Sequence, residues 1–231
     1  MRNALMSLAF ALTIASCGTS TAPSESAPAN DAVQTSGLKD GNYVANKVEP
    51  NVTWAAEKLT GEGHQGNLFV ENAKFMVKDG QIIAGLVTFD MTQISVTDLT
   101  GESKENLENH LKSGDFFNVE VHPKAVLTVN HSTAIENGNT TLNCTLNMNG
   151  IEATYDIPVV IATAPVPGSE HLEGISVSGK MMLDLTKHDI KYQSGTFFDN
   201  LDWAIKDDVT VGFRIMGTSM NASSVKVPQN F

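Results

Sequence analysis

The sequence predicts an all-β fold, an antiparallel barrel or sandwich of about eight strands with one short helix. Two observations favour this fold. Apolar and polar residues alternate along several segments, most regularly over residues 141–148, as in strands with one buried face. Turn dipeptides such as Asp79-Gly80 and Asn149-Gly150 separate these segments, and such pairs suit the positive φ angles of a two-residue hairpin.

The first sixteen residues are typical of an export signal. Arg2 precedes an apolar run from Ala4 to Ala15 that is too short to span a bilayer. The sequence Ile14-Ala15-Ser16-Cys17 resembles the lipobox of bacterial lipoproteins, so we expect cleavage before Cys17 and lipidation of its nucleophilic thiol. An ordinary secretory signal with an incidental cysteine is the alternative.

Residues 17–40 are expected to form the lipidated cysteine and a flexible tether, because small and polar residues dominate and no apolar period is present. The folded domain is expected over residues 41–220, followed by a C-terminal tail at 221–231. This organisation predicts a protein of the cell envelope that is held by its lipid at the outer membrane or on a periplasmic face.

Within the domain, strand patterns separated by turn residues follow one another closely. Pro158 is expected to mark an edge or a bulge, because it cannot donate to a strand ladder. A helix is predicted over residues 103–112, with Ser103 as its N-cap and Leu107, His110 and Leu111 on an inner face that would plug one end of a barrel. The predicted strands cover residues 67–77, 81–91, 124–135, 139–148, 151–164, 174–185 and 207–217, with a further strand from residue 52.

Composition excludes several function classes. The formal net charge of −11 disfavours phosphate backbones, so no nucleic-acid partner is expected. The six histidines form no metal-binding motif, and two cysteines make no disulfide framework. No nucleophilic or phosphate-binding motif is present. We therefore expect neither metal, nor cofactor, nor enzymatic activity.

In a closed barrel the apolar face of each strand points inward, and the interior is either filled by side chains or holds one ligand. The residues expected to face this lumen are Leu142, Cys144, Leu146, Met148, Met181, Leu183, Leu185, Val209, Val211, Phe213 and Ile215. From the alternation alone, a filled core and a ligand site both remain open.

Three stretches resemble the YceI-like family of bacterial polyisoprenoid-binding proteins. They are WAAEKLTGEGHQG at 54–66, FDMTQISVTDLTG at 89–101 with LENHLKSGDFFNVEVHPKA at 107–125, and LDLTKHDIKYQSGTFFDNL at 183–201. The resemblance implies a lipocalin-like extended antiparallel eight-stranded β-barrel. The chain departs from the family at His188-Asp189, where an aromatic residue and a glycine are usual.

The resemblance also implies a function: binding a long apolar isoprenoid or quinone-type lipid in the lumen, for sequestration or transport. By motif position, Lys58, His64 and Tyr192 are the candidates to contact a polar head group. The alternatives are a ligand-free structural or stress-interaction protein with a packed barrel, and an enzyme with an unrecognised site. A homodimer is left open.

Overall fold

The computed structural model describes residues 37–45, 52–166, 168–169 and 171–220. The export signal, Cys17, most of the predicted tether and the tail at 221–231 lie outside the described residues. The elements in chain order are β1 (Gly41–Ala45), β2 (Val52–Glu57), β3 (Gly63–Lys78), β4 (Gln81–Val96), α1 (Gly101–Lys112), β5 (Lys124–Ser132), β6 (Asn139–Met148), β7 (Ile151–Pro165), β8 (Glu173–Asp184), a 3₁₀ turn (Leu185–His188) and β9 (Asp208–Ser219).

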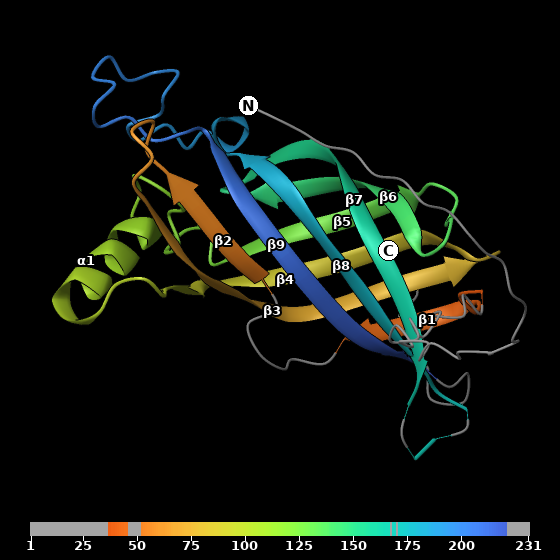
Figure 1. Ribbon diagram of the computed structural model, residues 1–231. Coiled ribbons are helices and arrows are strands. Elements are labelled where there is room, and N and C mark those ends of the chain that lie inside the picture. The colour runs from red at the N-terminus through yellow and green to blue at the C-terminus, as the bar shows by residue number, and fades with distance from the viewer. Residues whose placement is uncertain (1–36, 46–51, 167, 170, 221–231) are drawn as a thin grey trace, which may run out of the picture. The chain divides into compact units, whose positions relative to one another are not determined.

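The strands form one antiparallel sheet that closes on itself (Figure 1). Hydrogen-bonded neighbours run β1-β3-β2-β9-β8-β7-β6-β5-β4, and β4 pairs back onto β3. The predicted barrel is therefore confirmed, and a two-layered sandwich is excluded.

Nine strands occupy eight positions in the barrel wall because β1 and β2 share one of them. β2 pairs with the first part of β3, Gly63 to Leu68, and with β9. β1 pairs with the last part of β3, Ala73 to Val77, and with the end of β9. The two short strands run in the same direction between the same neighbours, so the expected eight-stranded barrel holds.

The predicted hairpin turns are confirmed by their backbone angles. Asn149 and Gly150 have φ angles of 53° and 77°, and Asp79 and Gly80 have φ angles of 52° and 71°. These positive values match the turn type that keeps the twist of the flanking strands. Pro158 does not lie at a bulge: it pairs with Thr141 in a regular β6–β7 ladder. On its other side it has no strand partner in the described sheet, because the β7–β8 pairs begin at Val159, so the predicted edge position is confirmed.

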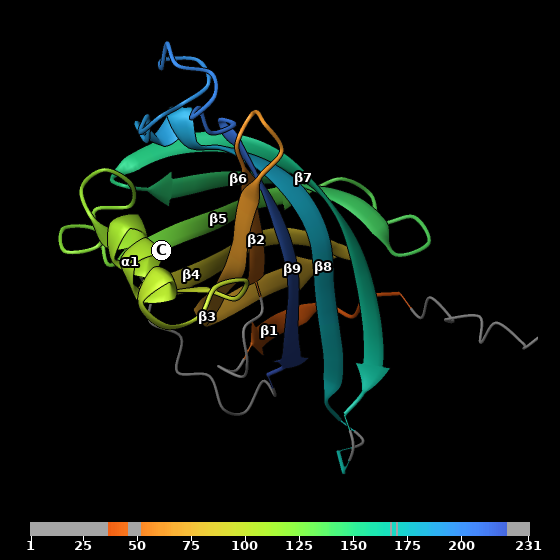
Figure 2. The same ribbon diagram turned by 60° about the vertical axis from the view of Figure 1, so that its left-hand side comes forward.

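Helix α1 covers one end of the barrel, beside β4 (Figure 2). It begins earlier than predicted: Thr100, not Ser103, is the N-cap, and the Thr100 side chain makes no capping hydrogen bond. Glu102 in the first turn and Lys112 in the last turn suit the helix dipole. We call this end, with α1 and the turns that follow β2 and β6, the α1 end.

Candidate ligand-binding site

The half of the barrel next to α1 is hollow. It encloses a cavity of about 380 Å³ that reaches the surface beside the turn between β2 and β3. All eight wall positions and α1 contribute side chains, because every second residue of each strand points inward. The apolar lining consists of Val52, Trp54, Ala56, Leu68, Phe89, Met91, Ile94, Leu107, Leu111, Phe116, Phe117, Ala125, Leu127, Leu146, Met148, Ile157, Met181, Leu183, Leu185, Ile205, Val209, Val211, Phe213 and Ile215.

Most residues predicted to face the lumen border this cavity. On β9 four alternate residues do so, from Val209 to Ile215, and on β8 Met181 and Leu183 do so. Leu146, Met148 and Leu185 also belong to the lining. Leu142 and Cys144 do not: both are buried in the apolar core outside the lining.

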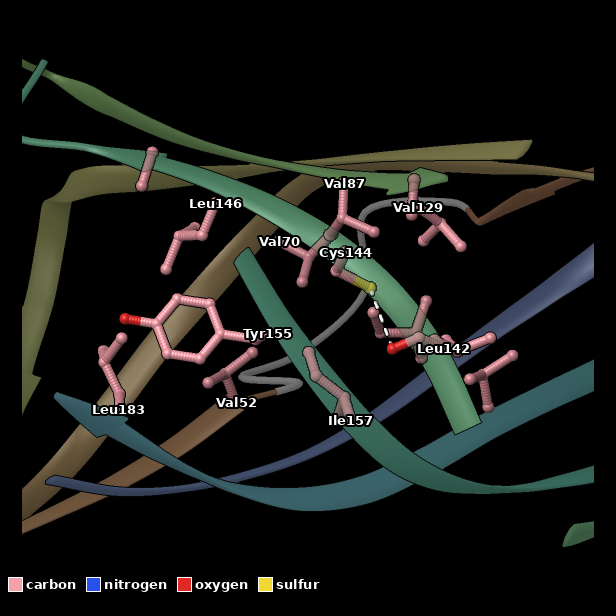
Figure 3. Close-up of a cluster of buried hydrophobic side chains, with 14 of the residues drawn as sticks. Val52, Val70, Val87, Val129, Leu142, Cys144, Leu146, Tyr155, Ile157 and Leu183 are labelled. Carbon is pink, nitrogen blue, oxygen red and sulfur yellow. Dashed lines mark hydrogen bonds between the residues drawn. The ribbon is translucent and has the colours of Figure 1, made fainter. Parts of the chain in front are cut away.

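The other half of the barrel is filled. Figure 3 shows Val87, Val129, Leu142 and Cys144 in one cluster of buried side chains. Three of them, Val87, Val129 and Cys144, are 0–1% exposed, and none of the four borders the cavity. The interior is thus neither an open tunnel nor a solid core along its whole length.

Cys144 is the free thiol of the described residues. Burial, with a smaller contribution from Asp156, raises its pKa to about 12. Its thiol donates a hydrogen bond to the carbonyl oxygen of Leu142 at 3.7 Å. A thiol that stays protonated is a poor nucleophile, so Cys144 is a packing residue.

Charged groups surround the cavity mouth in pairs. The Lys58 ammonium lies 3.2 Å from Glu62, and Nδ1 of His64 lies 2.8 Å from the Asp98 carboxylate. Burial alone would raise the pKa of Asp98, but hydrogen bonds from the Gln65 amide and from His64 outweigh it and hold the pKa below its ordinary value. The mouth therefore offers a cation and an imidazole within reach of a polar head group.

Of the three predicted head-group residues, Lys58 and His64 border the cavity and Tyr192 does not. The Tyr192 ring packs edge-on against His110, with ring centroids 4.7 Å apart, and lies 5.2 Å from Phe116. Since Phe116 belongs to the lining, Tyr192 lies one layer behind the cavity wall. Its motif position gave no indication of which side of the wall it occupies.

Trp54 is a lining residue whose ring lies against a glycine on the next strand. Trp54 and Gly66 are direct partners in the β2–β3 ladder. A Cβ on Gly66 would lie 2.5 Å from Cζ2 of Trp54 and 1.8 Å from the carbonyl oxygen of Ser95. Only glycine therefore lets the indole lie flat here, which gives a physical reason for the Trp-to-Gly spacing of the first motif.

Residues 43–216 match the sequence profile of the YceI-like domain. The chain belongs to the YceI-like family. No curated protein sequence matches the chain.

Two solved structures show the same YceI-like fold. BcnA from Burkholderia cenocepacia is 13% identical, with 72% of this chain and 94% of BcnA covered and a TM-score of 0.55. A polyisoprenoid binding domain from Saccharophagus degradans, implicated in plant cell wall breakdown, is 11% identical, with 79% and 100% covered and a TM-score of 0.53.

Sequence reasoning missed part of this YceI-like site. Phe89, Met91 and Ile94 on β4 and Ile205 before β9 border the cavity, although β4 carries a recognisable apolar alternation. His188 is fully buried, which its place in the third motif did not indicate. Across the described ranges no group of acidic, histidine and cysteine side chains is arranged to hold a metal ion, and no helix there is long and apolar enough to cross a membrane.

Proposed function

We propose that this chain is an envelope lipoprotein that holds the apolar part of an isoprenoid or quinone-type lipid in the cavity beneath α1. The observation that supports this most directly is the cavity itself. It is lined by apolar side chains and bordered by charged groups only near its mouth. Its volume lies within the range of about 300–1,000 Å³ typical of small-molecule sites.

Apolar contact alone supplies enough free energy for such binding. Transfer of about ten methylene equivalents from water into the cavity is worth roughly 8 kcal/mol before costs. A net value near 8 kcal/mol corresponds to a micromolar dissociation constant, and ordering a flexible tail offsets part of the gain. The flexible side chains of Met148 and Met181 suit a bent ligand.

A polar head group is expected at the mouth, beside Lys58 and His64. The His64 ring is oriented by Asp98, and the Lys58 ammonium also lies 5.1 Å from the centroid of the Trp203 ring. Both side chains remain partly exposed, so a quinone carbonyl or a prenol hydroxyl there could bind them without leaving water entirely.

The envelope location is proposed from the export signal and from Cys17, which would carry the lipid. A ligand-free packed barrel, the main alternative, describes the half around Cys144 but not the half beneath α1. Formation of a homodimer stays a prediction from the sequence.

The deciding experiment is a titration of the purified chain with prenylated benzoquinones, combined with organic-solvent extraction and mass spectrometry of protein taken from its native envelope. We expect saturable binding with one site per chain and a co-purified apolar molecule. If neither saturable binding nor a co-purified apolar molecule is found, the proposal is wrong and the ligand-free alternative is favoured.

A further inference from the structure

The division of the barrel into a hollow and a filled half limits the length of any ligand. Beyond the cavity lies a row of direct partners across four adjacent strands: Phe75 pairs with Gly85, Gly85 with Val129, and Val129 with Cys144. The row adjoins the lining directly on β5 and β6, and buried Val87 on β4 and Val70 and Ala73 on β3 lie in between. The side chains of Phe75, Val129 and Cys144 are 3%, 1% and 0% exposed. None of the three borders the cavity. We call these three residues the barrel floor.

Gly85 is what allows the floor to close. A Cβ at this position would lie 2.9 Å from Cδ1 of Phe75 and 3.1 Å from both Cβ and Cγ2 of Val129. The ring of Phe75 on β3 and the side chain of Val129 on β5 therefore fill the space over Gly85 on the intervening β4. They occupy volume that a longer lumen would leave to a ligand.

The depth of the hollow half follows from strand geometry. On β9 the lining residues run from Val209 to Ile215, which are separated by six residue steps along the strand. At about 3.3 Å per residue and a tilt of roughly 40°, this corresponds to about 15 Å along the barrel axis. An extended isoprene unit contributes four carbon–carbon bonds of about 1.5 Å in a zigzag, roughly 5 Å in all, so about three units fit.

We infer that this chain binds short-tailed isoprenoids, with about three isoprene units inside the barrel, and that Phe75, Val129 and Cys144 set this limit. The inference rests on the proposed function and narrows its ligand class. It departs from the expectation of a long ligand drawn from the family resemblance, since a long tail would have to leave part of its length outside the cavity.

The test measures affinity against tail length. Benzoquinones with tails of one to about ten isoprene units compete with a fluorescent two-unit prenyl probe for the full chain, at one fixed detergent concentration. Affinity is expected to rise roughly tenfold or more with each unit up to about three units, because each unit adds buried apolar carbon. For tails longer than about three units, the affinity is expected to stay within about threefold of its value at three units.

Phe75→Ala is the decisive variant, because it removes the largest floor side chain and should move the plateau to longer tails. Phe89→Ala is the matched control: the same side chain is removed from the cavity wall, so the cavity widens but the plateau keeps its position. Val129→Ala provides the same test as Phe75→Ala with a smaller core deletion, should the phenylalanine variant fail to fold.

The outcomes separate the two proposals. Binding of short-tailed quinones with a plateau that moves in a floor variant but not in Phe89→Ala supports the length limit. A continued rise in affinity to the longest tail in the unaltered chain, or a plateau that no folded floor variant moves, overturns it while the proposed function stands. If no tail of any length displaces the probe and the probe itself does not bind, the proposed function fails.

Discussion

The hydroxyl oxygen of Tyr155 lies 3.0 Å from Nε2 of His188 in the buried wall at the α1 end. The other ring nitrogen of His188, Nδ1, donates to the carbonyl oxygen of Ile151, also at 3.0 Å. A carbonyl oxygen can only accept, so Nδ1 carries the proton of the neutral imidazole and Nε2 accepts from the Tyr155 hydroxyl. Burial raises the pKa of Tyr155 to about 12, so its hydroxyl remains a donor.

This arrangement predicts a pH dependence of stability. Burial lowers the pKa of His188 below its ordinary value of 6.5 in the folded chain, although hydrogen bonds to backbone carbonyls and the charge of Asp184 oppose the shift. Below pH 6.5 the unfolded chain therefore binds more protons than the folded one, so the free energy of unfolding falls as the pH falls. Well above pH 6.5 the ionisation of His188 no longer changes the free energy of unfolding.

Urea unfolding between pH 5 and about pH 8 measures the effect. His188→Gln removes the titrating group while keeping polar atoms in the site, so its free energy of unfolding should decline less steeply at acidic pH than that of the unaltered chain. Equal slopes in the two proteins would show that His188 is not the group responsible.

A second prediction concerns the close approach of Trp54 and Gly66. Gly66→Ala should lower the free energy of unfolding by about 2 kcal/mol or more, because the new methyl group collides with backbone and with the indole. Gly212→Ala is the control: a Cβ there meets only the hydroxyl of Thr53, at 3.0 Å. Chemical denaturation of both variants checks this, and similar losses would contradict it.

Two neighbouring alanines test where the ligand lies. Ala56 borders the cavity, whereas Ala55, the preceding residue of β2, does not. Ala56→Phe should weaken binding of prenylated quinones at least tenfold by filling the cavity, and Ala55→Phe, on the opposite face of the strand, should leave it within about twofold. Isothermal titration calorimetry of the two variants provides the comparison; equal affinities would place the ligand elsewhere.

Cys17→Ala should release the protein from membranes into the soluble fraction, since the thiol that would carry the lipid is gone. The natural control is Cys144→Ala, which alters the other cysteine of the chain. Cell fractionation and immunoblotting of both variants checks the prediction. A Cys17→Ala protein that still sediments with membranes would remove the lipoprotein proposal.

In the Cys17→Ala background Cys144 is the single thiol. With its pKa raised to about 12 and its side chain fully buried, it should react with a thiol reagent at pH 8 at least a hundredfold more slowly in the native protein than in urea. Rapid native labelling would mean that the filled half opens readily.

The alternation of residues predicted which side chains point inward, and the turn dipeptides predicted where the chain reverses. Neither the alternation nor the turn dipeptides indicate how far along the barrel axis a side chain lies. Leu146 and Cys144 have the same position in the strand pattern, yet one borders the cavity and the other lies in the floor. At the level of Cys144 the side chains of Phe75 and Val129 fill the space over Gly85, a packing between strands that no local pattern encodes.

Other misses have equally specific causes. β1 has only five residues and directly follows a polar stretch, so its pattern was too short to recognise. His188 is buried because its two ring nitrogens find partners on β7, residues more than thirty positions earlier in the chain. Tyr192 was assigned by motif position, which fixes an order along the chain but not a side of the wall.

The pairing of β4 back onto β3 affects how readily strands of other protein molecules can add to this sheet. Within the described residues, a sheet that returns to its own beginning has no terminal strand whose full length a foreign strand could join. Dense crowding of such molecules on one surface would therefore favour neither fibres nor exchange of strands between neighbours.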